Sequence, residues 1–245
     1  MQRLQTIIFT DLDGTLLDHH SYSWQAATPA LAMLRQQQIP LILCTIKTTA
    51  EVAVLHQELN LSSPYIVENG AAIILSAEPK PAHFFGSSYQ ELLDLVHELR
   101  NKQGYRFSGF NDFTSAEVAA ETGLNLAQAE LAKQRLCSEP IRWEDDEQAL
   151  QRFQKDLAAH NLQLLRGGRF YHILSKTADK GAALRWLLNN YPAKPNCAWR
   201  SVALGDGPND QSLLDAADLA VVIPSQSGAS PRPVGWNQTI LEILK

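Results

Sequence analysis

The stretch "QTIIFTDLDGTLL" (residues 5–17) joins an apolar run to two aspartates, Asp11 and Asp13. The apolar run predicts a buried β-strand. Side chains two positions apart on a strand point the same way, so the two carboxylates are expected to lie close together. At about 4 Å and an effective dielectric constant of about 20, two such charges repel by roughly 4 kcal/mol. The stretch therefore predicts a site where other groups compensate this repulsion.

The composition describes a globular protein with a moderate acidic excess. The chain has 245 residues, 45% of them hydrophobic, which is enough for one large domain or two modest ones. With 21 basic and 26 acidic residues, its net charge of -5 gives no general attraction to nucleic acid or to an anionic membrane surface. No apolar run approaches the roughly 20 residues of a membrane-spanning helix. We expect neither nucleic acid nor a membrane as a partner; the oligomeric state stays open.

The cysteines indicate the compartment. Cys44, Cys137 and Cys197 are odd in number and lack the spacing of metal ligands, so they are expected to be core residues. The N-terminus runs into the first predicted strand without a basic region followed by a long apolar stretch. These features predict a reduced, cytoplasmic protein.

Strands and helices alternate along the first part of the chain. "TPALAMLRQQQ" (residues 28–38) predicts a helix with Thr28 as N-cap and a proline at the first helical position. "IPLILCT" (residues 39–45) predicts a buried strand, and Thr48 with Glu51 forms a capping box that starts the next helix. This alternation predicts an α/β fold: a Rossmann-like core with a parallel sheet and helices on both faces.

The middle of the chain has a different pattern. Residues 85–166 contain amphipathic helices separated by short strands, which predicts an inserted α+β domain. The alternation of strand and helix resumes after residue 166. We therefore expect residues 1–84 and 167–245 to form the core, interrupted by the inserted domain.

Several polar residues follow predicted strands. One more, Lys180, begins the helix that precedes a predicted strand. In open parallel sheets, sites form at the carboxyl ends of the strands, so these residues are expected to converge. Carboxylates, one hydroxyl and one or two ammonium groups at one sheet edge need a divalent cation, and oxygen ligands suit Mg²⁺. The residues are Asp11, Asp13, Thr45, Lys47, Lys180, Asp206 and Asp210.

In this order, "DLDGT" (residues 11–15), Thr45, Lys180 and "GDGPND" (residues 205–210) resemble the four motifs of the haloacid dehalogenase superfamily. Within that superfamily the chain is similar, over nearly its whole length, to the mannosyl-3-phosphoglycerate phosphatase family. The stretches that carry this likeness are "CTIKTTAE" (44–51), "ENGA" (68–71), "TGLNLAQAELAKQR" (122–135), "GGRFYH" (167–172) and "GDGPND". The chain departs from the family pattern at Ile46 and Gly207, whereas Thr45 keeps a hydroxyl.

The resemblance implies catalytic roles for the residues at the strand ends. Asp11 would attack phosphorus and form an aspartyl-phosphate, and Asp13 would act as acid and base. Asp11, Asp206 and the main-chain carbonyl of Asp13 would hold Mg²⁺, with Asp210 orienting the outer shell. Thr45 and Lys180 would neutralise phosphoryl oxygens. Gly14 would let the chain turn beneath the phosphate.

The resemblance also implies a substrate. We expect a Mg²⁺-dependent phosphomonoester hydrolase that acts on a phosphorylated sugar derivative, mannosyl-3-phosphoglycerate or its glucosyl analogue, with the inserted domain as a cap that sets specificity. Four residues are expected to bind the substrate: Lys47, Asn69, Arg169 and His172. Arg135, Arg142 and Trp143 could also face a substrate, although a solvated face is the favoured interpretation.

Other functions are compatible with parts of the pattern. Each motif alone is more typical of a turn or a solvated lysine, but together, in order and at strand ends, they favour a site. A phosphomutase of the same superfamily would need a bisphosphate to return its phosphoryl group. A signalling receiver also has an acidic pocket and a lysine, but it is about half as long and has no inserted domain. A relic that only binds ligand would usually have lost one of the two leading aspartates.

Overall fold

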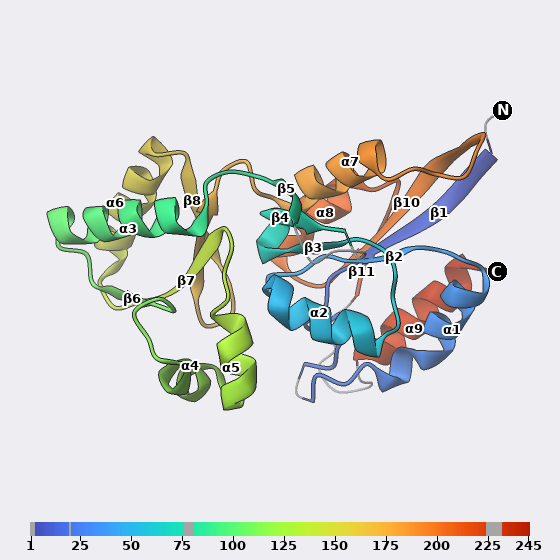
Figure 1. Ribbon diagram of the computed structural model, residues 1–245, viewed down its shortest axis with the longest axis horizontal. Helices are drawn as coiled ribbons and strands as arrows, with labels where there is room; N and C mark the ends of the chain where they lie inside the picture. The colour runs from blue at the N-terminus through green and yellow to red at the C-terminus, as the bar shows by residue number, and fades with distance from the viewer. Residues whose placement is uncertain (1–2, 20, 76–80, 224–231) are drawn as a thin grey trace. The chain divides into compact units, whose positions relative to one another are not determined.

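The computed structural model describes residues 3–19, 21–75, 81–223 and 232–245 (Figure 1). The chain divides into two compact units. The first unit comprises Met1–Thr45, Leu61–Ile66 and Lys180–Lys245, and the second comprises Ile46–Asn60 and Val67–Asp179. Within the described ranges, no helix combines the length and the hydropathy needed to span a membrane.

The first unit alternates strands and helices. Its elements are β1 (Arg3–Thr10), α1 (Thr28–Gln36), β2 (Leu41–Leu43), α7 (Lys180–Asn190), β10 (Cys197–Gly205), α8 (Gln211–Ala216), β11 (Leu219–Val222) and α9 (Arg232–Ile243). Strand β3 (Tyr65–Val67) begins in the first unit and ends in the second.

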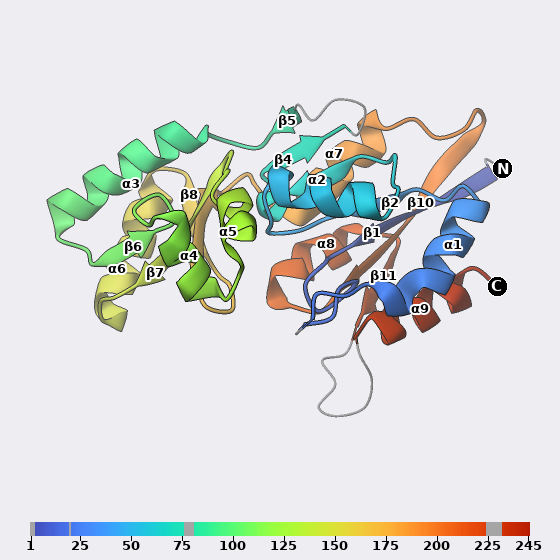
Figure 2. The ribbon, with the colours of Figure 1, turned by 60° about the horizontal axis from the view of Figure 1, so that its bottom comes forward.

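A parallel sheet forms the centre of the first unit, with the strand order β11-β10-β1-β2. Helices α1 and α9 pack together on one side of it, and α7 and α8 pack together on the other (Figures 1 and 2). Because helices cover both faces, Ile7, Ile8 and Phe9 in the middle of β1 have no exposed surface. The predicted parallel core with helices on both faces is confirmed.

The two predicted helix starts have different outcomes. Thr48 is the N-cap of α2: its hydroxyl accepts a hydrogen bond from the Glu51 nitrogen at 3.2 Å, and the Glu51 carboxylate accepts one from the Thr48 nitrogen at 2.8 Å. The prediction of Thr48 as a cap is therefore confirmed. The prediction of Thr28 as an N-cap is wrong, because a helical turn already precedes it and Ala27 is the N-cap of α1. The Thr28 hydroxyl donates to the Gln25 carbonyl instead.

The second unit mixes short strands with helices. Its elements are α2 (Thr49–Glu58), β4 (Ala72–Ile74), β5 (Pro81–Phe84), α3 (Tyr89–Gln103), β6 (Phe107–Gly109), α4 (Ser115–Thr122), α5 (Leu126–Ala132), β7 (Ser138–Trp143), α6 (Glu147–Ala159), β8 (Leu162–Arg166) and β9 (Tyr171–Ser175).

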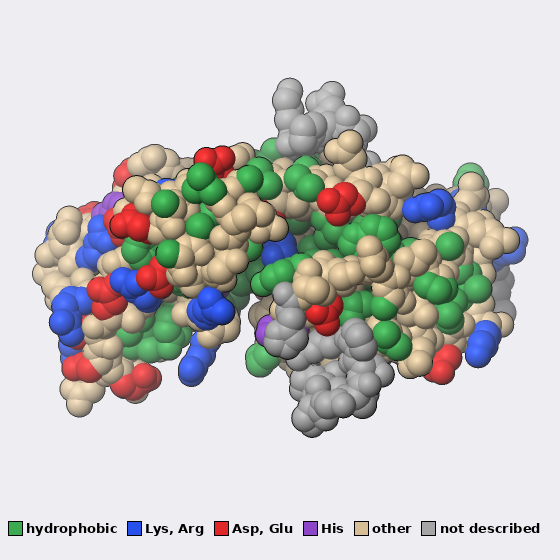
Figure 3. Space-filling view, turned by 90° about the horizontal axis from the view of Figure 1, so that it is seen from below, with side chains coloured by type: hydrophobic (Ala, Val, Ile, Leu, Met, Phe, Trp, Pro, Cys, Tyr) green, Lys and Arg blue, Asp and Glu red, His purple; other side chains and the backbone are tan. Residues whose placement is uncertain are grey.

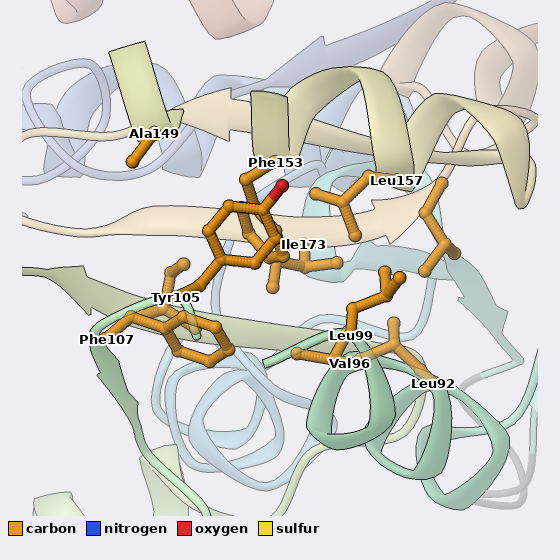
Figure 4. Close-up of a cluster of buried hydrophobic side chains, with 11 residues drawn as sticks. Leu92, Val96, Leu99, Tyr105, Phe107, Ala149, Phe153, Leu157 and Ile173 are labelled. Atoms are coloured by element: carbon orange, nitrogen blue, oxygen red, sulfur yellow. The ribbon is translucent and has the colours of Figure 1, made fainter. Parts of the chain in front are cut away.

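An antiparallel sheet with the order β6-β7-β9-β8 supports the main core of this unit. Leucines and a valine of α3 meet Phe153 and Leu157 of α6 over the sheet (Figure 4). The Trp143 ring stacks on Phe153 with centroids 5.3 Å apart. Trp143 therefore packs against this core, and its expected place on a solvated face is corrected. Arg142 is partly exposed and pairs with Glu121 and Glu144.

The antiparallel sheet extends beyond residue 166, where the inserted domain was expected to end. Strand β9 pairs with β7 and β8, with Ile173 opposite Glu139 and Leu164. A strand was expected there, but as part of the parallel sheet. Apolar alternation identifies a strand without identifying its partner, because both kinds of sheet present the same period of two.

Charges of both signs lie on one face of the second unit. On the face shown in Figure 3, Lys and Arg side chains alternate with Asp and Glu side chains over the second unit.

The Glu139 carboxyl group lies deep in the second unit. Glu139 on β7 is 2% exposed and accepts hydrogen bonds from the Tyr89 hydroxyl at 2.7 Å and from the Asn111 nitrogen at 2.8 Å. A side chain at Gly109 would collide with it, because an added Cβ would lie 2.1 Å from Glu139 Oε1. Burial outweighs these hydrogen bonds and raises the pKa of Glu139 from 4.5 to about 7.

Replacing Glu139 by glutamine should change how stability depends on pH. The folded state holds the Glu139 proton more tightly than the unfolded state, so this stabilisation is complete below about pH 4.5 and is lost as the pH rises through about 7. Between those pH values, the wild-type free energy of unfolding should fall relative to that of Glu139→Gln by roughly 3 kcal/mol. Urea unfolding of both proteins across the pH range, followed by tryptophan fluorescence, measures the difference.

Glu130→Gln is the matched control, because Glu130 is exposed on α5. Its difference from the wild type should stay nearly constant over the same pH range. If the free energies of unfolding of Glu139→Gln and the wild type ran parallel against pH, Glu139 would not be the group that causes the pH dependence.

Candidate functional site

Asp11 lies at the end of the central strand of the parallel sheet. Its nitrogen donates to the Leu204 carbonyl at 2.9 Å, which continues the pairing of β1 with β10, and the residue is 4% exposed. The chain then turns sharply, with Gly14 at φ +80°, a left-handed conformation that favours glycine. The Thr15 hydroxyl reaches Asp206 Oδ1 at 3.4 Å. The turn thus brings the first motif against the strand end after β10.

Lys180 begins α7 and is almost completely buried. Its Nζ donates to Asp11 Oδ1 at 2.7 Å and to Asp210 Oδ1 at 2.6 Å. Burial alone would favour the neutral amine, but the two carboxylates outweigh burial and raise the pKa of Lys180. A permanent ammonium therefore links Asp11, directly after β1, to Asp210 in the loop after β10.

Asp11 remains short of positive charge despite this contact. Burial raises the pKa of its carboxyl group to about 7, against the opposing effect of Lys180, and the nearby Asp210 and Asp13 carboxylates raise it further. One ammonium is therefore too little to keep Asp11 fully ionised near neutral pH. An additional cation beside Asp11 would favour the ionised form.

Asp210 has its carboxylate fully engaged by neighbours. Oδ2 accepts hydrogen bonds from the nitrogens of Asp206 and Gly207, both at 3.0 Å, while Oδ1 accepts from Lys180. Gly205 permits this packing, because an added Cβ there would lie 2.5 Å from the Asp210 Cβ. Asp210 thus shapes the "GDGPND" loop and orients Lys180.

The carboxylates of Asp11, Asp206 and Asp210 form a group that fits a metal ion. Each contributes an oxygen, and these oxygens all lie within 4.8 Å of one another. The donors are all oxygen, and the Lys180 ammonium hydrogen-bonds to only two of the three carboxylates, so the charge and chemistry suit a hard divalent cation such as Mg²⁺. The Asp13 side chain is outside this group, and the ligand expected from Asp13 is its main-chain carbonyl.

Thr45 follows the neighbouring strand β2. The Cys44 nitrogen donates to the Thr10 carbonyl at 2.8 Å, and the Thr45 nitrogen donates to the Ile66 carbonyl at 3.0 Å. The chain after β2 therefore runs beside the chain after β1, and Thr45 is fully buried. All the predicted catalytic and metal-binding residues belong to the first unit.

The four predicted substrate-binding residues belong to the second unit. The Lys47 carbonyl accepts a hydrogen bond from the Glu68 nitrogen at 3.0 Å, which ties Lys47 to the neighbour of Asn69. Asn69 is 3% exposed, and within the described part of the chain its Oδ1 atom has no hydrogen-bond partner. Such an atom is a candidate for a contact with a ligand.

His172 and Arg169 lie in different surroundings. His172 is buried on β9, its Nδ1 has no hydrogen-bond partner among the described residues, and burial lowers its pKa to about 3, with help from Arg135. His172 is therefore neutral near pH 7. Arg169 is exposed, and its Nη1 donates to the carbonyls of Glu121 and Thr122 at the end of α4. These two hydrogen bonds use one nitrogen, Nη1, of the Arg169 guanidinium.

Sequence reasoning missed a buried ion pair in the second unit. Arg135 was expected on a solvated face, but it is 8% exposed and lies beside Glu68, whose side chain is completely buried. Glu68 directly follows β3, so it is a polar residue at a strand end, like Asp11. That signal could have identified Glu68, whereas the pairing with Arg135, 67 positions later in the chain, required the fold.

Comparisons with known proteins show what the chain is similar to. The family model for haloacid dehalogenase-like hydrolases matches residues 8–227. A glucosyl-3-phosphoglycerate/mannosyl-3-phosphoglycerate phosphatase of Methanococcoides burtonii is 37% identical over 98% of each chain.

Solved structures share the fold at lower identity. One, from a study of a trigonal-bipyramidal intermediate in a phosphoryl-transfer superfamily, has a TM-score of 0.72 and 15% identity, and covers 98% of this chain and 99% of the other. A sugar phosphatase of haloacid dehalogenase subclass IIB has a TM-score of 0.67 and 17% identity, and covers 89% of this chain and 87% of the other.

Replacing Lys180 by methionine should destabilise the protein. The change leaves the buried Asp11 and Asp210 carboxylates without their ammonium, and losing one partner of a buried ion pair typically costs about 3 kcal/mol or more. Urea unfolding in the presence of a metal chelator measures this loss without compensation by added ions.

Arg185→Met provides the control, since Arg185 is an exposed cation on the same helix. It should change the free energy of unfolding by less than about 0.5 kcal/mol. A similarly small effect of Lys180→Met would mean that the buried ion pairs contribute nothing to stability.

Proposed function

The chain belongs to the haloacid dehalogenase-like hydrolase family, and on this premise we propose that it hydrolyses a phosphomonoester, with Mg²⁺, through an aspartyl-phosphate. The proposed substrate is mannosyl-3-phosphoglycerate or its glucosyl analogue. The observation that carries the chemistry is the Asp11 carboxylate, held by Lys180 beside Asp206 and Asp210. The likeness to the Methanococcoides burtonii phosphatase, over nearly the full length of both chains, supports the substrate.

The proposed reaction has two displacements at phosphorus. In the first, Asp11 forms a bond to phosphorus while the ester bond breaks, and Asp13 gives a proton to the departing alcohol oxygen. In the second, Asp13 takes a proton from water, the water oxygen bonds to phosphorus, and the Asp11–phosphorus bond breaks to release inorganic phosphate. Lys180 and Thr45 would neutralise the equatorial oxygens as charge spreads over them.

The metal would be held by Asp11, Asp206 and the main-chain carbonyl of Asp13. When bound, Mg²⁺ supplies positive charge that offsets the repulsion between the phosphate and the carboxylates. The raised pKa of Asp11 supports this assignment, because the nucleophile must be ionised to attack. Asp210 contributes indirectly, since its oxygens already accept hydrogen bonds from Lys180 and two main-chain nitrogens.

Substrate selection is assigned to residues of the second unit. The first-unit residues would contact only the phosphoryl group and the metal, so they would not distinguish one alcohol from another. Lys47 would pair with the glycerate carboxylate, while Asn69 and the neutral His172 would hydrogen-bond to hydroxyls. The guanidinium hydrogens of Arg169 that the α4 carbonyls leave available would contribute further contacts.

We also assign the protein to the cytoplasm. Its three cysteines are thiols that are not joined in disulfides, Cys44 and Cys137 being buried and Cys197 half-buried. Thiols that are not joined in disulfides are typical of proteins in reducing compartments.

Removal of divalent ions should abolish hydrolysis of p-nitrophenyl phosphate. Three carboxylates lie close together and the Lys180 ammonium hydrogen-bonds to two of them, so a negatively charged substrate would be repelled without a further cation. Activity should return when excess Mg²⁺ is added after the chelator. Full activity in a large excess of chelator would remove the metal from the proposed mechanism.

Asp11→Asn and Asp13→Asn should have different effects on the two displacements. Asp11→Asn should form no phosphoenzyme, because an amide is a poor nucleophile. Asp13→Asn should still form some phosphoenzyme with p-nitrophenyl phosphate, whose leaving group needs little protonation. Acid quenching followed by mass spectrometry measures the phosphoenzyme in both variants. Turnover of Asp11→Asn near the wild-type rate would assign the nucleophile to another residue.

A substrate panel tests the proposed function, and Lys47→Ala tests its specificity. The wild type should prefer glycosyl-3-phosphoglycerates to simple sugar phosphates. Lys47→Ala should lower kcat/KM for the preferred substrate by about 10²-fold, as expected for a lost charge-assisted contact of roughly 3 kcal/mol, with much less change on p-nitrophenyl phosphate.

Two results would contradict these assignments. A wild type without preference for glycosyl-3-phosphoglycerates would reject the substrate. Equal losses of Lys47→Ala on both esters would assign Lys47 to the chemistry or to folding.

A further inference from the structure

The turn between β3 and β4 has an unusual backbone. Three consecutive residues are left-handed, Glu68 at φ +50°, Asn69 at +58° and Gly70 at +90°. Glycine adopts this conformation readily and asparagine tolerates it, but glutamate seldom does. Such a conformation persists only where the surroundings enforce it, and strained backbone of this kind is concentrated at functional sites.

The Glu68 carboxylate shows what enforces the turn. It accepts hydrogen bonds from the nitrogens of Leu136 and Cys137, at 2.7 Å and 3.0 Å, and from the Ser138 hydroxyl at 2.7 Å. Arg135 Nε lies 3.7 Å from Glu68 Oε2, and both side chains are at most 3% exposed. The carboxylate is thus fixed by three donors and a buried guanidinium.

The same network reaches the segment that carries Lys47. Arg135 Nη2 donates to the Ile46 carbonyl at 3.3 Å and to the Ser138 hydroxyl at 2.6 Å. The Glu68 nitrogen donates to the Lys47 carbonyl at 3.0 Å. Residues 46–47 and 68–69 are therefore held to each other and to residues 135–138.

We propose that Glu68 and Arg135 are positioning residues that hold Asn69 and Lys47 for substrate binding. The proposal rests on the proposed function, which assigns Asn69 and Lys47 to the substrate. Asn69 has the features of a positioned binding group, because its Oδ1 is buried and has no hydrogen-bond partner in the described part of the chain. That oxygen would accept a hydrogen bond from a substrate hydroxyl.

Stability alone gives a weak reason for this ion pair. Buried ion pairs are often no more stabilising than apolar side chains of similar volume. A positioning role gives a distinct kinetic result: loss of the pair should matter only where the positioned groups contact the substrate. A merely structural role would affect every substrate alike.

The test is a double-mutant cycle with Glu68→Gln and Asn69→Ala. Steady-state rates are measured on mannosyl-3-phosphoglycerate, or on the better ester of the substrate panel, and on p-nitrophenyl phosphate. Glu68→Gln alone should lower kcat/KM for the larger ester by about 10-fold or more. On p-nitrophenyl phosphate the same change should cost no more than about 3-fold. On the larger ester in the Asn69→Ala background it should cost less than it does alone, because the Asn69 contact is already lost while Lys47 remains.

Two results would overturn the positioning role. The first is an equal loss on both esters, and the second is an undiminished loss in the Asn69→Ala background. Should Glu68→Gln fail to fold, Ser138→Ala replaces it in the cycle, because it removes the Ser138 hydrogen bonds to Glu68 and from Arg135 and leaves the ion pair. Tyr105→Phe is the matched control: it removes the hydrogen bond from Tyr105 to Asp156 in the same unit, away from this network, and should leave both rates nearly unchanged.

The cycle also separates this inference from the proposed function. If the wild type prefers a different phosphate ester, the proposed substrate is wrong, and the cycle is read on that ester. Coupling between Glu68 and Asn69 there would support positioning, and its absence would overturn it.

Discussion

The ammonium of Lys180, held between Asp11 and Asp210, is the interaction on which the candidate site depends. It joins the start of α7 to the ends of β1 and β10, so three segments far apart in the sequence share one buried charge. Lys180 offsets only part of the free-energy cost of burying the Asp11 charge, so the pKa of Asp11 stays raised. The site therefore keeps a deficit of positive charge, which a divalent cation can fill.

The second unit uses the same physical device with the charges placed differently. Glu68 follows β3 as Asp11 follows β1, and Arg135 provides its counterion. The Glu68 carboxylate, however, is saturated by main-chain and hydroxyl donors, so this pair holds backbone in place and is not available for chemistry. A reactive carboxylate needs incomplete compensation, and a positioning carboxylate needs complete compensation. In our proposals, the two units have different roles because the Asp11 charge is compensated incompletely and the Glu68 charge completely.

Much of the fold could be predicted because local signals agreed with it. The apolar strands and the capping box at Thr48 each require only neighbouring residues, and the alternation of strand and helix then implies a parallel sheet. The predictions failed where the outcome depended on distant partners. Strand β9 alternates as a strand of either sheet would, and its pairing with β7 and β8 decides its place. Arg135 appears solvated until Glu68 is placed beside it.

The sequence by itself determined the family and predicted the candidate site residues, because "DLDGT", Thr45, Lys180 and "GDGPND" are each recognised from neighbouring residues and their order along the chain is specific. Only the tertiary structure decided which charges compensate one another. Lys180 could have been a solvated helix residue, yet it is buried between two carboxylates, which raise its pKa and keep it an ammonium. His172 could have been a cation, yet burial beside Arg135 keeps it neutral. Burial and the distances between charges control ionisation, and both arise only when remote segments of the chain pack together.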